Sequence, residues 1–292
     1  MNRHSTVPSD FALAQQAAME AGRLLRKQRA AWNQVTSVTQ HDIKLQADRA
    51  AETVILKILK EGSPYPILSE EAGELKATNP NSSPRLSGES SSSLRGLGEL
   101  CGKSSISSVP PDKEYLWIVD PLDGTVNYSR GTPLSAVSIG LWQNNKPVYG
   151  VIYDFWRDEL FHGGSGFGAF MGYQSIKVSG TTDPQLAILA TGFPANSDHN
   201  TAPLQQFLES VQRFKKIRLL GTAALSMAYV ACGRTDAYME RDIMLWDIAA
   251  GAAIVQGAGG VISIEPSSRV PNACLTKAAA SIDLLNALES KK

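Results

Sequence analysis

The sequence predicts a mixed fold, in which an α+β first half built on an antiparallel sheet is followed by an α/β second half. Three observations lead to this expectation. Two segments near the start have the periodicity of amphipathic helices, short apolar strands with turn signals dominate from residue 115, and strands alternate with helical segments beyond residue 187. A chain of 292 residues is long enough for two subdomains around one site, and we expect them to span 1–155 and 156–292.

The first elements expected are two helices joined by a short connection. Apolar side chains recur at helical spacing over 11–29, where Ser9 or Asp10 is a natural N-cap. A loop or short hairpin is expected over 36–43, and a second helix at about 45–60. Asp48 falls inside this second helix, either as a surface acid or as a partner of the functional residues.

An antiparallel sheet is expected next, because apolar or alternating runs are broken by turn signals at 144–145 and 157–158. Its strands are predicted at 116–119, 136–142, 146–154 and 159–163. The glycine-rich segment 163–172 favours a hairpin over a phosphate-binding loop, because no lysine-serine or lysine-threonine pair and no helix follows the glycines.

The second half alternates strands and helices. Strands are expected near 187–192, 216–220 and 237–239, and helices near 202–214, 222–232 and 247–256, with a last strand and short helix over 273–288. The segment 74–113 is rich in Ser, Pro and Gly and poor in large apolar residues, so it is expected to be a flexible surface insertion. It is either a lid near the functional residues or an inert insertion.

The most informative motif is Trp117–Thr125, WIVDPLDGT, in which an apolar strand ends in two carboxylates three residues apart. Pro121 stops the strand and Gly124 permits backbone geometry that other residues resist. Asp120 and Asp123 would repel each other unless a cation lay between them, and carboxylate oxygens suit Mg²⁺. The alternative is that both aspartates merely cap backbone amides of the turn.

Two other apolar segments also end in acids. One ends at Glu70 and Glu71, and the other leads through Trp246 into Asp247 at the start of a helix, where helix capping is the alternative role. Adjacent side chains of an extended chain alternate in direction, so we expect Glu70 to face the site and Glu71 to face loop 72–76, a neighbouring group or solvent. Three such segments together predict a polynuclear oxygen-ligand site.

These three blocks, SEE at 69–71, DPLDGT at 120–125 and WDIAAGAAIVQGAGG at 246–260, resemble the inositol monophosphatase family of lithium-sensitive, magnesium-dependent phosphatases. The resemblance covers most of the chain apart from 74–113 and the last residues. It implies a layered αβαβα sandwich of the inositol monophosphatase and fructose-1,6-bisphosphatase type. One departure is DIKLQAD at 42–48, where Lys44 and Leu45 replace the family's usual valine and threonine beside the expected metal site.

The resemblance implies hydrolysis of a small polyol phosphate, with inositol monophosphate the leading substrate, by water activated by two or three Mg²⁺ ions. The implied metal ligands are Glu70, Asp120, the carbonyl of Leu122, Asp123 and Asp247. Thr125 and Glu70 would position the attacking water, and Asp123 is counted with them as catalytic. The implied substrate contacts are the amides of Gly124 and Thr125 for the phosphate, and Gly221, Thr222, Ala223, Glu240 and Asp247 for the remainder.

Other activities remain open on the same scaffold: histidinol phosphate, a sugar phosphate or a 3′-phosphoadenosine nucleotide as substrate, or a catalytically weak binding or regulatory protein. Metal-assisted hydrolysis needs no nucleophilic side chain. The chain's three cysteines have no CxxC spacing and its four histidines are scattered. We therefore expect these seven residues to be structural or to lie on the surface.

Charge and composition narrow the expected partners. With 28 basic and 28 acidic residues, the net charge of zero gives no support to binding of a nucleic-acid polymer. No segment approaches the roughly 20 apolar residues of a membrane span, and no signal core is evident. The chain has only three cysteines, an odd number, which suits the reducing environment of the cytoplasm. A homodimer is expected from the family resemblance alone.

Overall fold

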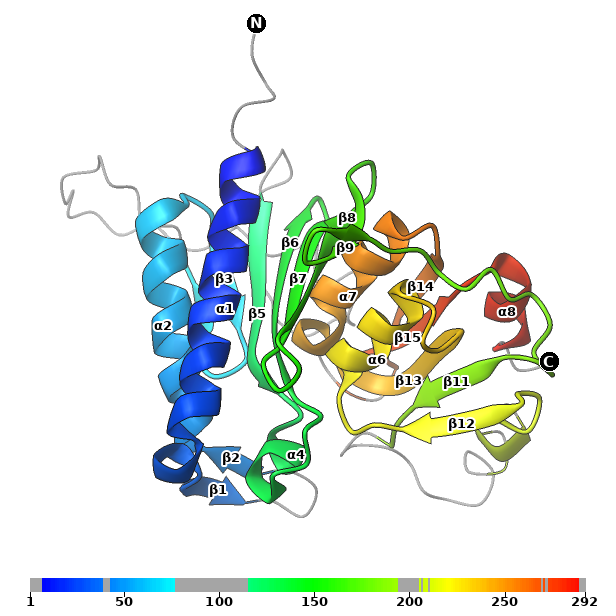
Figure 1. Cartoon of the computed structure of the whole chain (residues 1–292), viewed down its shortest axis with the longest axis horizontal. Coiled ribbons are helices and arrows are strands. Elements are labelled where there is room, and N and C mark those ends of the chain that lie inside the picture. Colours follow the sequence, from blue (N-terminus) through cyan, green and yellow to red (C-terminus); the bar gives the residue numbers. More distant parts are fainter. Residues whose placement is uncertain are drawn as a thin grey trace, which may run out of the picture.

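The computed structural model describes residues 7–38, 43–76, 115–193, 205, 207–209, 211–268, 270 and 273–288. Figure 1 shows five layers, alternating helices and sheets. Helices α1 (Val7–Trp32) and α2 (Gln46–Gly62) cover the outer face of an eight-stranded sheet. Helices α6 (Ala223–Ala231) and α7 (Leu245–Gly257) lie between this sheet and a five-stranded sheet, whose outer face carries α8 (Ile282–Ala287). This is the αβαβα sandwich that the sequence led us to expect.

The eight-stranded sheet has the order β10-β9-β8-β7-β6-β5-β3-β4 and is antiparallel except where β3 pairs with β5. Its strands are β3 (Ile67–Ser69), β4 (Gly73–Leu75), β5 (Tyr115–Asp123), β6 (Ala136–Gln143), β7 (Lys146–Asp154), β8 (Glu159–Gly164), β9 (Gly168–Met171) and β10 (Gln174–Ser175). The β6–β7 turn has positive φ at Asn144 and Asn145, which asparagine tolerates in tight hairpins. The expected antiparallel strands and the hairpin over 163–172 are confirmed.

The five-stranded sheet has the order β12-β11-β13-β15-β14. Its strands are β11 (Ile188–Thr191), β12 (Lys216–Leu219), β13 (Ala237–Met244), β14 (Val261–Pro266) and β15 (Ala273–Ala279). Residues 205, 207–209 and 211 of the helix expected over 202–214 are helical, and 202–204, 206 and 210 lie outside the described residues. The division at residue 155 stays a prediction, and β8, β9 and β10, which follow it, belong to the large sheet.

The N-terminal elements agree with expectation in the hairpin and differ from it at the start of α1. The connection after α1 forms a two-stranded hairpin of β1 (Val35–Val38) and β2 (Ile43–Leu45). Helix α1 already begins at Val7, so the proposed caps Ser9 and Asp10 lie within its first turn. Most of the insertion expected over 74–113 lies outside the described residues, and its role as lid or inert segment stays a prediction.

Close packing of α7 on the large sheet fixes the position of its first turn. A Cβ added to Gly150 on β7 would lie 2.1 Å from the carbonyl oxygen of Ala250, and one added to Gly140 on β6 would lie 2.9 Å from the backbone of Ala249. Only glycine allows this approach of backbone to backbone. The start of α7 is thereby held against the end of β5.

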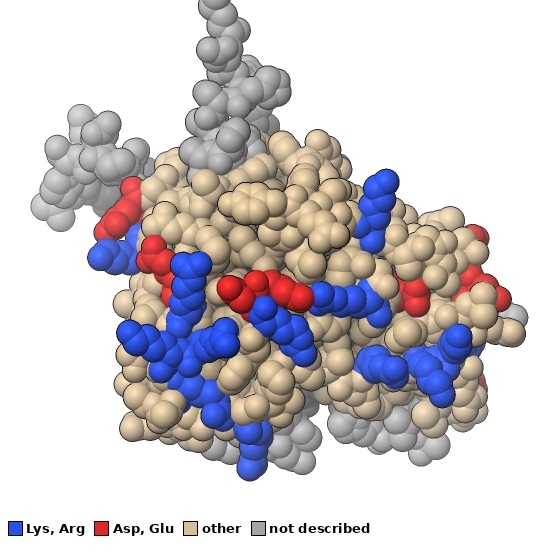
Figure 2. Space-filling model, viewed as in Figure 1, with Lys and Arg blue, Asp and Glu red and all other residues tan. Residues whose placement is uncertain are grey.

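Figure 2 shows basic side chains gathered over the lower part of one face, with acidic side chains between them along its middle. The charge of this face is therefore mixed rather than of one sign. Within the described ranges, no helix is both long and apolar enough to cross a membrane.

Candidate active site

Three aspartates converge where β5 ends and α7 begins. One carboxylate oxygen each of Asp120, Asp123 and Asp247 lies within 4.8 Å of the other two. Residues three apart on a regular strand face opposite sides of the sheet, but the register against β6 shifts between Asp120 and Asp123. This bulge, which contains Pro121, brings both carboxylates to one side. Asp247 reaches them from the third position of α7.

Electrostatics in this cluster favour a bound cation. Burial raises the pKa of Asp123 to about 6, against hydrogen bonds that favour its ionised form. The pKa values of Asp120 and Asp247 rise well above the usual range through burial and then through the other acids, including Glu70. The three carboxylates disfavour one another's ionisation, with Asp120 and Asp123 buried and Asp247 partly buried. They form an oxygen-only donor set, which fits a hard divalent cation such as Mg²⁺.

Helix N-termini orient two of these aspartates. The Thr222 hydroxyl donates to Asp123 Oδ2, and the Ala224 amide donates to the same oxygen at 2.9 Å, at the start of α6. The Met244 amide donates to Asp247 Oδ2 at 3.2 Å, so Asp247 caps α7 and also belongs to the cluster. The positive ends of both helices therefore face the carboxylates.

Glu70 lies beside the three aspartates rather than within their group. Its amide donates to the Val119 carbonyl at 3.1 Å, which places it next to the end of β5 and close enough to Asp120 for the two carboxyl groups to interact. Burial raises the pKa of Glu70 to about 7, opposed by the positive charge of Lys44. Lys44 Nζ is 3.4 Å from Glu70 Oε1 and also contacts Glu71, whose side chain is only 7% exposed. Glu71 is thus paired and buried rather than solvated.

Thr125 links the turn after β5 to helix α2. Its hydroxyl lies 3.0 Å from Asp48 Oδ1 and 2.9 Å from the Leu122 carbonyl oxygen. Asp48 is buried, and its other oxygen accepts the Leu45 amide at 2.6 Å. Burial raises the pKa of Asp48 to about 6, and these hydrogen bonds oppose the rise. Asp48 occupies the third position of α2, as Asp247 does in α7, and this shared placement is the sequence signal that identifies Asp48.

The expected substrate contacts lie around Asp123. Asn127, which the sequence reasoning missed, donates from Nδ2 to the carbonyls of Leu220 and Gly221 at 2.8 and 3.2 Å, tying α4 (Thr125–Arg130) to the loop before α6. Ala223 is the first residue of α6. Glu240 on β13 accepts the Tyr238 hydroxyl at 2.9 Å, and burial raises its pKa to about 7, with Asp123 contributing.

Comparison with known proteins identifies the scaffold. The model of the inositol monophosphatase family matches residues 8–284. The chain belongs to the inositol monophosphatase family. An inositol-1-monophosphatase of a Synechocystis species is 33% identical over 268 residues, covering 88% of this chain and 80% of the relative.

Other family members carry two kinds of name. A Nus factor SuhB of Xylella fastidiosa is 36% identical over 230 residues, covering 78% of this chain and 71% of the relative. The solved inositol monophosphatase of an Anabaena (Nostoc) species superimposes with a TM-score of 0.72 at 32% identity, covering 97% of this chain and 96% of that one. As a member of the inositol monophosphatase family, the protein is a phosphoric monoester hydrolase.

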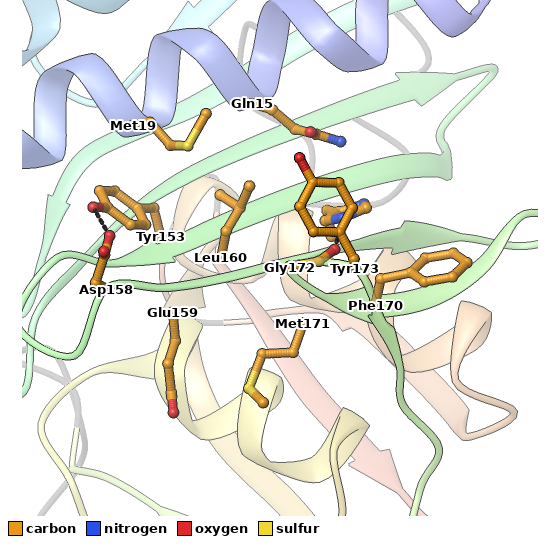
Figure 3. A pocket seen from close by; sticks show the side chains of 11 residues that line it. Gln15, Met19, Tyr153, Asp158, Glu159, Leu160, Phe170, Met171, Gly172 and Tyr173 are labelled. Carbon is orange, nitrogen blue, oxygen red and sulfur yellow. Dashed lines mark hydrogen bonds between the residues drawn. The ribbon is translucent and has the colours of Figure 1, made fainter.

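A cavity of this family member lies apart from the acid cluster. A cavity of about 590 Å³ lies between α1, which contributes Gln15 and Met19, and strands β7 to β9 (Figure 3). Its lining includes Tyr153 and His162 but none of the clustered acids. The chemistry of phosphate hydrolysis therefore points to the ends of β3 and β5, not to this cavity.

Proposed function

We propose that the protein hydrolyses the phosphate monoester of a small polyol in the presence of Mg²⁺, with inositol monophosphate as the leading substrate. The observation that carries this proposal is the convergence of Asp120, Asp123 and Asp247 beside Glu70 and Thr125. Side chains from three distant segments meet at one place, and all of the acids offer hard oxygen atoms. Such a set suits phosphoryl chemistry rather than nucleophilic catalysis by a side chain.

The ligands assigned to two or three Mg²⁺ ions are Glu70, Asp120, the carbonyl of Leu122, Asp123 and Asp247. When bound, Mg²⁺ ions lower the pKa of a coordinated water and offset charge on the transferring phosphoryl group. The protein's part is to hold the acids at this place. The bulge in β5 and the packing of α7 supply that rigidity.

Thr125 and Glu70 are assigned to the attacking water. When the Thr125 hydroxyl donates its proton to Asp48 Oδ1, the Thr125 oxygen is free to accept a hydrogen bond from the water. A carboxylate oxygen of Glu70 accepts the water's other hydrogen. Asp48 thus acts through Thr125 as a positioning residue.

The phosphate and alcohol ends of the substrate use different groups. We assign the amides of Gly124 and Thr125 to the phosphate oxygens. Glu240 and the segment 221–223, with Asp247, face the alcohol, where a carboxylate accepts hydrogen bonds from hydroxyl groups. The same contacts accommodate a sugar phosphate, histidinol phosphate or a 3′-phosphoadenosine nucleotide, which are the alternative substrates.

A second candidate function follows from the relatives named Nus factor SuhB, because that name is not the name of a phosphatase. On this alternative, the chain is a catalytically weak binding or regulatory protein on the same scaffold. We also propose that the protein is a cytoplasmic homodimer, which gel filtration with light scattering tests directly.

Phosphate release separates the two functions. The protein is assayed with inositol monophosphate and the alternative substrates, in Mg²⁺, in EDTA, and in Mg²⁺ with added Li⁺. We expect release that requires Mg²⁺, is inhibited by Li⁺ and is lost in Asp247→Asn. Asp183→Asn is the matched control, because Asp183 is exposed and its side chain accepts the Gln185 amide in a turn. Absence of release from every compound would favour the regulatory function.

A further inference from the structure

Lys44 forms ion pairs with the two acidic side chains that follow β3. Its Nζ is 3.4 Å from Glu70 Oε1 and contacts Glu71 Oε1 as well. The side chains of Lys44 and Glu70 are 35% and 22% exposed, so water screens the pair only in part.

The three aspartates are held in a different way. Asp123 accepts neutral donors, the hydroxyl of Thr222 and the amide of Ala224, and Asp247 accepts the amide of Met244. These donors orient the carboxylates without neutralising them. Among the described residues near the cluster, Glu70 and Glu71 are therefore the acids that form an ion pair with a lysine.

We infer that Lys44 is a built-in counter-ion of Glu70 and Glu71, which weakens the binding of the divalent ion that Glu70 would share and leaves the ion of the three aspartates unaffected. The inference rests on the proposed metal site. Its physical basis is that an ammonium group and a divalent cation compete for the same carboxylate, and repel each other when both are near it. A chain with this lysine needs more metal to fill the site.

Mn²⁺ binding without substrate tests the inference. Titration calorimetry, with electron paramagnetic resonance to count bound Mn²⁺, compares the parent protein with Lys44→Met and Lys44→Gln, which remove the charge. We expect the weaker class of Mn²⁺ to bind at least tenfold more tightly in both variants, or one further ion to be bound, with the tighter class unchanged. Lys44→Arg keeps the charge and is expected to resemble the parent.

The control is Lys57→Met, which removes an exposed positive charge on helix α2, whereas Lys44 lies on β2. Equal or weaker Mn²⁺ binding in both charge-removing variants, including no binding by any of the proteins, overturns the inference. So does the same tightening in Lys57→Met, which would reveal a general effect of net charge. Circular dichroism checks that each variant is folded.

The result can be told apart from failure of the proposed function. Tighter Mn²⁺ binding without phosphate release would support the counter-ion and reject the hydrolase proposal. Phosphate release with unchanged Mn²⁺ binding would support the hydrolase proposal and reject the counter-ion.

Discussion

Replacing Asp123 with asparagine should stabilise the metal-free protein while removing its activity. Asp123 is 8% exposed, and burial raises its pKa from 3.8 to about 6. One pKa unit corresponds to about 1.4 kcal/mol, so an ionised Asp123 costs the metal-free fold about 3 kcal/mol near pH 7.5. This cost already includes the favourable hydrogen bonds from Thr222 and Ala224, because they act on the same pKa.

Asparagine keeps much of the local bonding. Its oxygen can still accept from Thr222 or Ala224, and its amide nitrogen can donate towards the carboxylates of Asp120 and Asp247. We therefore expect Asp123→Asn to raise the free energy of unfolding by about 2 kcal/mol in EDTA, after an imperfect fit is allowed for. For a chain of this size, that corresponds to a rise in Tm of about 4 °C.

Thermal unfolding in EDTA over a range of pH tests both the sign and the size of this change in the free energy of unfolding. Below about pH 6 the folded parent takes up a proton on Asp123, while the unfolded chain does so only near 3.8. The parent therefore gains stability as the pH falls from about 6 towards 4, and the advantage of the variant shrinks over that window. Mg²⁺ should raise the Tm of the parent more than that of the variant.

Three results would refute this reasoning. One is a variant less stable than the parent in EDTA at pH 7.5, which would mean that lost hydrogen bonds outweigh the relief from burying a charge. Another is an advantage that does not shrink towards pH 4. The third is retained Mg²⁺-dependent phosphate release, which would remove Asp123 from the metal site.

Three further predictions concern the catalytic water, the alcohol end of the site and the fold. Thr125→Val removes the hydroxyl that contacts Asp48. We expect the rate of phosphate release to fall by about 10²–10³-fold while Mn²⁺ binding is unchanged. A fall of less than fivefold would contradict the role of the hydroxyl. Glu240→Gln should raise KM for inositol monophosphate about tenfold and lower kcat less, and steady-state kinetics that show only a kcat effect would count against a substrate contact. Gly150→Ala should destabilise the protein by about 3 kcal/mol or more in denaturant unfolding, because its Cβ would meet the Ala250 carbonyl; an unchanged midpoint would contradict the close packing of α7.

Local chemistry explains why the sequence identified the fold and the main acids. The turn signals at 144–145 and the glycines of 163–172 act within a few residues, so the antiparallel sheet was predictable strand by strand. Asp120 and Asp123 stood out because Pro121 and Gly124 mark the turn around them. The start of α1 was misjudged by a few residues, because more than one residue near a helix end can act as its cap.

The tertiary structure decided which groups act on these acids, because the partners are far apart in the chain. The hydroxyl of Thr125 meets Asp48 across 77 residues, and the hydroxyl of Thr222 meets Asp123 across 99. Side-chain type and spacing in the sequence identified candidate acids and expected contacts. Which hydroxyl meets which acid depends on how α2 and α6 pack around the end of β5. That packing is set by the whole core, so the ion pair of Lys44 with Glu70 and Glu71 became visible only in the folded chain.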